Sequence, residues 1–113
     1  MPIFPFEIEY YITEDGRKPF KIWLEGLKDI SGRAKIRVRL DRARLGNLGD
    51  SRSIGEGVHE LRVDYGPGYR IYFAIQDRCL LLLLLGGDKS HQRRDIATAK
   101  EYWQDHKERK KHD

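Results

Sequence analysis

The residues best suited to chemistry in this sequence are cations and one phenol on two strand-like segments. Arg62 lies in the alternating segment 58–65, and Arg70 and Tyr72 lie in the alternating segment 69–76. Successive side chains of a strand point to opposite faces of a sheet. If the apolar side chains of both segments face one core, Arg62, Arg70 and Tyr72 lie together on the second face.

A glycine-rich turn adds further candidates. Lys89 and His91 follow a Gly-Gly pair at 86–87, where glycine permits a close backbone approach, so the turn can bring both residues to the end of the second face. Arg93 and Arg94 fall in the first turn of an expected helix. The result is a cluster of cations with one imidazole and one phenol, which is suited to handling RNA.

Such a cluster could cleave RNA without a metal, with the neighbouring 2′-hydroxyl as the nucleophile. One group must take the 2′ proton, one must protonate or neutralise the departing 5′ oxygen, and cations must hold the extra negative charge of the transition state. Arginine suits the last task because its planar fork matches two phosphate oxygens. Tyr72 could stack on a splayed base, as is usual in single-stranded RNA binding.

The first half of the chain must supply elements that support these strands. Residues 6–13 alternate in polarity, which predicts a strand with one buried face. Its apolar members are Phe6, Ile8, Tyr10 and Ile12. Pro19 suits the first position of a short helix. The segment 31–45 fits both a strand and a helix by periodicity; we interpret it as a helix, because Ser31 can cap its start and Gly46 can end it.

The middle of the chain is predicted to form a loop followed by a hairpin. Residues 47–57 are rich in Gly, Ser and Asp and are expected to form a loop. Segments 58–65 and 69–76 then pair around Gly66-Pro67-Gly68. The apolar run 79–85 is typical of a central strand covered on both faces.

The end of the chain is predicted to form one more helix. The segment 86–89 is expected to break the preceding strand, and Ser90 can cap the helix that follows. Its charged tail, 107–113, is expected to fray. The sequence thus predicts a single domain over residues 1–113, in the order β-α-α-β-β-β-α.

Composition narrows the class of protein. The 113 residues include one cysteine, Cys79, which excludes an intramolecular disulfide and suits a reducing compartment, so we expect a cytoplasmic protein. A net charge of +4 favours polyanionic partners. The leucine run 80–85 is too short to cross a bilayer, so no membrane association is expected. The four histidines are scattered and no nucleotide motif occurs, so we expect no metal and no cofactor.

The chain resembles the RelE/ParE superfamily of toxins, and most of all its HigB-like "addiction module killer protein" branch. The likeness spans nearly the whole chain. The motifs that carry it are Val58-His59-Glu60-Leu61-Arg62, Gly66-Pro67-Gly68-Tyr69-Arg70-Ile71-Tyr72-Phe73, Leu84-Leu85-Gly86-Gly87-Asp88-Lys89-Ser90-His91-Gln92, Asp95-Ile96-Ala97-Thr98-Ala99 and Phe20-Lys21-Ile22-Trp23-Leu24.

This resemblance implies an α+β fold of the RelE type, with helices on a curved, mostly antiparallel sheet, here of four strands. It implies the toxin of a type II toxin–antitoxin system: a ribosome-dependent endoribonuclease that cleaves mRNA and is neutralised by a helix-turn-helix antitoxin. Operator DNA would be bound only through the complex with the antitoxin.

By motif, Arg70 corresponds to the family's phosphate-binding arginine and Arg62 to a second basic position near the substrate. Lys89 stands where relatives place a catalytic basic residue, and His91 resembles a histidine or tyrosine that some relatives use nearby. The catalytic candidates are therefore Arg70, Lys89 and His91, and the RNA-binding candidates are Arg62, Tyr72, Arg93 and Arg94. The general acid and base stay unassigned.

Other interpretations are open for single residues and for the whole protein. Arg70 and Arg62 could pair with Glu60 across the hairpin instead of binding RNA. Trp23 and Trp103 are expected in the core. A ParE-like inhibitor of DNA gyrase and a non-catalytic RNA-binding domain are the alternative functions, since a fold by itself does not imply an activity.

Overall fold

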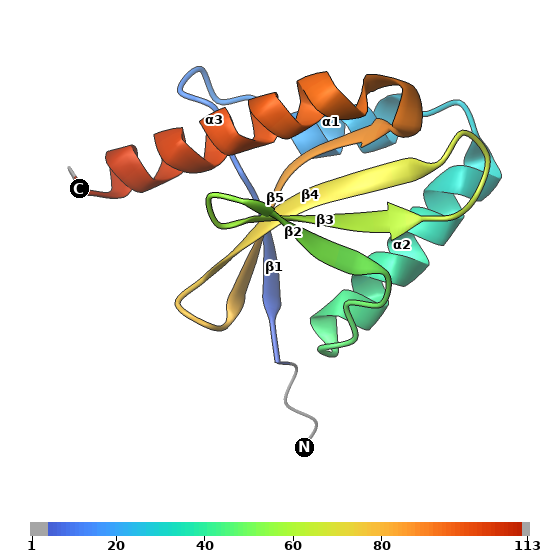
Figure 1. Cartoon of the computed structure of the whole chain (residues 1–113), viewed down its shortest axis with the longest axis horizontal. Helices are drawn as coiled ribbons and strands as arrows, with labels where there is room; N and C mark the ends of the chain where they lie inside the picture. Colours follow the sequence, from blue (N-terminus) through green and yellow to red (C-terminus); the bar gives the residue numbers. More distant parts are fainter. Residues whose placement is uncertain (1–4, 112–113) are drawn as a thin grey trace.

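The computed structural model describes residues 5–111 of the chain. Its elements form one α+β unit in which a sheet is covered by helices on both faces (Figure 1). In chain order they are β1 (Glu7–Tyr10), α1 (Pro19–Gly26), α2 (Ile30–Arg44), β2 (Ser51–Gly55), β3 (Val58–Val63), β4 (Tyr69–Gln76), β5 (Leu80–Asp88), the 3₁₀ turn η1 (Lys89–His91) and α3 (Gln92–Lys111).

The sheet has five strands in the order β1-β5-β4-β3-β2. β1 runs parallel to β5, and the other three pairings are antiparallel. The prediction of four strands was wrong because the expected loop 47–57 contains β2. Its polar residues show little alternation, and it forms a strand because it can pair with β3, where Arg52 lies opposite Glu60.

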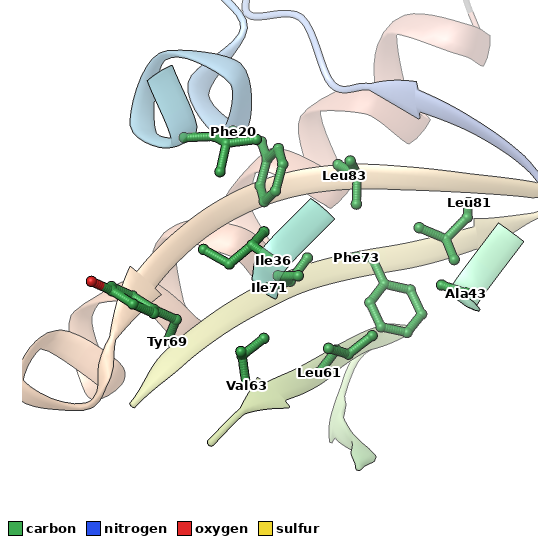
Figure 2. Packing of buried hydrophobic residues seen from close by; sticks show 11 residues of the cluster. Phe20, Ile36, Ala43, Leu61, Val63, Tyr69, Ile71, Phe73, Leu81 and Leu83 are labelled. Carbon is green, nitrogen blue, oxygen red and sulfur yellow. The ribbon is translucent and has the colours of Figure 1, made fainter. Parts of the chain in front are cut away.

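Two apolar clusters hold the layers together. On one face of the sheet, α1 and α2 contribute Phe20, Ile36 and Ala43, which meet strand residues such as Ile71 and Phe73 (Figure 2). On the other face, α3 packs through Ala99 and the half-buried Tyr102 and Trp103. Burial of this kind is the main favourable term in folding. The second face of the sheet is therefore a second core, with α3 and α2 on opposite sides of the sheet (Figure 1).

The first strand departs from its predicted pattern. Phe6 and Ile8 pack against the first cluster, as expected, but Tyr10 and Ile12 are exposed. Tyr11 is buried instead, in the cluster beneath α3, and its hydroxyl donates a hydrogen bond to Asp105 at 2.6 Å. The alternation predicted one covered face, whereas α3 covers the other face as well.

The helix boundaries also differ in detail. Segment 31–45 is a helix, but Asp29 caps it in place of Ser31, with its Oδ1 accepting the Gly32 N–H at 2.9 Å. The same side chain accepts a hydrogen bond from Tyr69 of β4 at 2.8 Å, so the cap also ties α2 to the sheet. Gly46 follows the helix with φ of 94°, as a terminating glycine does.

The junction between β5 and α3 is continuous where a break was predicted. β5 runs through Gly86 and Gly87 to Asp88, and Asp88, not Ser90, caps the turn that follows. The tail that was expected to fray is helical through Lys111; residues 112–113 lie outside the described part. None of the described helices is long and apolar enough to cross a membrane.

Candidate functional site

The fold gathers most of the predicted cations at one edge of the sheet, where β3 and β5 end and where β4 and α3 begin. Arg62 and Arg70 face each other in the β3–β4 ladder, and Gly87 of β5 is the partner of Arg70 on its other side. Lys89 and His91 are the first and last residues of η1, which follows Asp88 at the end of β5. The basic cluster, as we call it, consists of Arg62, Arg70, Lys89, His91, Arg93 and Arg94.

Gly68 marks the point where two of these cations meet. A Cβ atom at Gly68 would lie 3.3 Å from Nη1 of Arg70 and 3.5 Å from Cβ of Lys89. Gly68 also has φ of 82°, a conformation that favours glycine. The close approach of Arg70 and Lys89 thus depends on a glycine in the β3–β4 turn.

Arg70 lies mostly below the surface, with 7% of its area exposed. Its Nη1 donates to the carbonyl oxygen of Gly68 at 3.1 Å, and its Nε lies 3.8 Å from Oε2 of Glu60. That separation is too long for a hydrogen bond, and Nε has no hydrogen-bond partner among the described residues. Arg70 is therefore held in place, and the donor that stays unused is its buried Nε.

Glu60 is the anion at the centre of this region, although the sequence analysis gave it no functional role. It is fully buried, and its Oε1 accepts from Nε of Arg52 at 3.1 Å while Oε2 accepts from Nε2 of Gln92 at 2.9 Å. The alternative pairing of Arg70 with Glu60 is thus present, but as the longest of three contacts. Through Gln92, Glu60 also ties β3 to the first residue of α3.

Tyr72 is not the exposed stacking platform that the sequence predicted. It lies on the second face as expected, yet α3 covers that face and the ring is fully buried. Its hydroxyl has no hydrogen-bond partner among the described residues. Burial, together with the negative charges of Glu60 and Asp95, raises the pKa of Tyr72, so this phenol is neutral and does not act as a base at physiological pH.

The turn after β5 presents His91 with one ring nitrogen already engaged. Oδ1 of Asp88 accepts from the Ser90 N–H at 3.0 Å and lies 3.1 Å from Nδ1 of His91. Hydrogen bonds from Ser90 and His91 hold the pKa of Asp88 below its usual range. A carboxylate at Nδ1 favours the tautomer with a proton there, which leaves Nε2 to take or give a proton. The His91 side chain is 52% exposed, so a substrate can reach it.

The Gly-Gly pair has a steric explanation on each face of β5. A Cβ at Gly86 would overlap the Trp23 ring of α1, and a Cβ at Gly87 would overlap Oδ2 of Asp95 of α3. The expected close backbone approach at these glycines is confirmed. Burial raises the pKa of Asp95, which is 6% exposed. Asp95 is thus a second buried carboxyl beside the basic cluster, and the sequence analysis named it in a motif without giving it a role at the site.

The remaining cations lie at the edge of the cluster. Arg62 pairs with Asp50 at 3.0 Å, rather than with Glu60, and both side chains are about half exposed. Arg93 and Arg94 lie in the first turn of α3, as predicted. Both are exposed, and Nε of Arg94 lies 3.7 Å from Oδ1 of Asp95. Pairs of this exposure contribute little to stability, so these arginines are available to a ligand.

Sequence reasoning could have reached Glu60 but not its partners. The alternation of β3 and β4 places Glu60 on the same face of the sheet as Arg62 and Arg70, and an acidic residue that shares a face with two arginines was a usable signal. Arg52 was assigned to a loop, and Gln92 is uncharged, so neither residue was predicted to contact Glu60. Their convergence depends on pairings between distant segments.

No protein-family model matches the chain. An uncharacterized protein of Haemophilus influenzae is similar to it, with 48% of the residues identical over 81 aligned residues. The aligned part comprises 72% of this chain and 82% of the Haemophilus protein. At this identity and coverage the two proteins share a fold and an origin, and the chain belongs to the same family as this Haemophilus influenzae protein.

Proposed function

We propose that the protein is the toxin of a type II toxin–antitoxin pair and that it cleaves mRNA on the ribosome. The proposal unites the resemblance to RelE/ParE toxins of the HigB-like kind with the basic cluster. The observation that carries it is the meeting of Arg70 and Lys89 at Gly68, next to an exposed imidazole whose Nδ1 contacts Asp88.

In this proposal the scissile phosphate binds between Lys89 and the accessible edge of Arg70. Lys89 is exposed and forms no ion pair among the described residues, so its charge is free to neutralise a phosphate oxygen. Arg70 is fixed by Gly68 and Glu60, so it needs little reorganisation as charge develops in the transition state.

His91 would carry the proton transfer. Its Nε2 can take the proton of the 2′-hydroxyl or give one to the departing 5′ oxygen, and both steps require a heavy-atom distance of about 3 Å in the bound state. Arg62, Arg93 and Arg94 would hold the flanking phosphates, which gives binding that weakens as salt rises. Tyr72 supports the site from beneath rather than touching the RNA.

The test is to add the purified protein to ribosomes carrying a defined mRNA and to map new 5′ ends. Wild-type protein should produce cuts that require the ribosome. Lys89→Ala and His91→Ala should reduce cutting by about 100-fold or more, as is typical when a transition-state or proton-transfer group is lost. Arg17→Ala is the matched control, because Arg17 is exposed and pairs only with Asp15 among the described residues.

The same variants allow a loss of activity to be distinguished from a loss of folding. Lys89 and His91 are exposed, so alanine at either position should leave urea unfolding unchanged. Arg70→Ala removes a cation next to the buried Glu60. Its unfolding curve is therefore compared with those of Lys89→Ala and His91→Ala before its loss of cutting is interpreted. Full cutting by Lys89→Ala and His91→Ala together would refute this site. A protein that arrests growth yet cuts no mRNA, and that blocks supercoiling by DNA gyrase, would refute the proposed activity.

A further inference from the structure

Helix α2 has apolar residues on both of its sides. Its inner side is buried through Ile36 and Ala43. Its outer side carries Ile30, 73% exposed, and Val38, 47% exposed, with the exposed Ala34 between them. Residues four positions apart are neighbours on a helix surface, so these three form one continuous outer stripe. An amphipathic helix with a single buried face would carry polar residues here, and α2 does so only from Asp41 onward, which lies in line with the stripe three positions after Val38.

A groove of about 410 Å³ runs beside this stripe. Its wall on α2 carries the apolar Ala34 and Val38 together with the basic Lys35, Arg39 and Arg42, and its other wall consists of Val63 at the end of β3 and the following Asp64 and Tyr65. The groove is therefore large enough for apolar side chains of another molecule. Exposed apolar surface next to a hollow is typical of a surface that binds a partner.

Cations line both flanks of the outer stripe. α2 contains six basic residues and one acidic residue, Asp41. At 100° per residue, Arg33, Arg37 and Arg44 lie along one flank, and Lys35, Arg39 and Arg42 lie along the other. Arg39 is engaged, since it donates to the carbonyl oxygens of Arg62 and Leu48. None of the other five forms an ion pair within residues 5–111.

We propose that this face of α2 binds an acidic amphipathic segment of a partner protein. Apolar side chains of that segment would enter the groove beside Val38, and its carboxylates would pair with the two cationic flanks. The arrangement is that of a helix laid against a groove, in which the apolar seam gives affinity and the flanking charges set the choice of partner.

Other occupants match this face less well. Among the five cations of α2 that form no ion pair within residues 5–111, Lys35 lies over the Tyr65 ring, with its Nζ 4.9 Å from the ring centroid. A second copy of the chain would still place the other four cations opposite four of the same charge, which costs free energy through like-charge repulsion. A nucleic acid would satisfy the arginines, but its phosphates would leave Ile30 and Val38 without apolar contacts. An acidic amphipathic protein segment uses both features. This inference is independent of the proposed ribonuclease activity, because α2 contributes no residue to the basic cluster.

The test measures the binding of labelled helical peptides by fluorescence anisotropy. The probe is a peptide of 15 residues, the length of α2, with a leucine stripe and glutamates on both flanks. Two control peptides replace the glutamates by lysines or the leucines by serines. The protein variants are Val38→Asp and Arg37→Glu, and the matched control is Ala97→Asp, at an exposed helical position on α3.

We expect the acidic leucine peptide to bind wild type and Ala97→Asp equally, and to bind Val38→Asp and Arg37→Glu about tenfold or more weakly. Both control peptides should bind at least tenfold more weakly than the probe. Equal binding of the serine peptide would overturn the proposal in favour of a general polyanion site. Absence of any binding, equal binding by all four proteins, or a wild-type dimer in sedimentation that Val38→Asp disperses would overturn it as well.

Discussion

The contact between Gly87 and Asp95 gives the sharpest test of how α3 sits on the sheet. A Cβ at Gly87 would overlap Oδ2 of Asp95 and would lie 3.0 Å from its Cγ, but 3.8 Å from its Cβ. Gly87 does not have a positive φ, so alanine is compatible with its backbone and the cost of Gly87→Ala is steric. Overpacking of this kind costs about 1–3 kcal/mol. We expect about 2 kcal/mol, because Asp95 is a short side chain on a packed helix.

The same geometry predicts that the cost disappears when the carboxylate is removed. In an Asp95→Ala background the nearest atom would be the Cβ at 3.8 Å, an ordinary van der Waals contact. Gly87→Ala should then cost less than about 0.5 kcal/mol, so the double-mutant cycle should give a coupling energy of about 1.5–2 kcal/mol.

Urea unfolding of the four proteins measures this coupling, and thermal unfolding should show Gly87→Ala melting roughly 10 °C below wild type for a domain of this size. Gly26→Ala is the control, because nothing lies within 4 Å of a Cβ at that position. Additive effects of Gly87→Ala and Asp95→Ala, within about 0.5 kcal/mol, would refute the reasoning that Asp95 rests on the Gly87 backbone.

Two further predictions concern the buried polar groups beside the basic cluster. Because burial raises the pKa of Asp95, the folded state favours its protonated form, and the stability this gives at low pH is lost as the pH rises through the folded-state pKa. Asp95→Asn should therefore be more stable than wild type at pH 7 in urea unfolding, and this difference in stability should vanish below about pH 4. A difference that grows toward low pH would contradict the prediction. Tyr72→Phe should stay within about 1 kcal/mol of wild type and should cut mRNA equally well, because the buried hydroxyl has no partner among the described residues; a larger loss of stability, or a loss of cutting in a folded variant, would show that this hydroxyl is used.

The sequence alone determined the local elements and the facing of the central strands. Alternation along 69–76 separated Ile71 from Arg70, and the structure confirms both faces. The hairpin around 66–68 and the helix 31–45 followed from glycine positions and apolar spacing. These features depend on residues close together in the chain, where backbone geometry and burial act on the same pattern.

Only the tertiary structure decided what covers each face and which charges meet. The sequence placed Tyr72 on the second face, but α3 turned that face into a core and buried the ring. The sequence predicted a loop over 47–57. An edge strand such as β2 is stabilised by pairing with its neighbour and needs no strong pattern of its own, so its residues gave no strand signal. The contacts of Glu60 with Arg52 and Gln92 join segments up to 32 positions apart, and no local pattern encodes such a meeting. Burial and ion pairing depend on the whole packed arrangement, so the exposure and the ion-pair partner of each cation were set by the fold and not by its place in the chain.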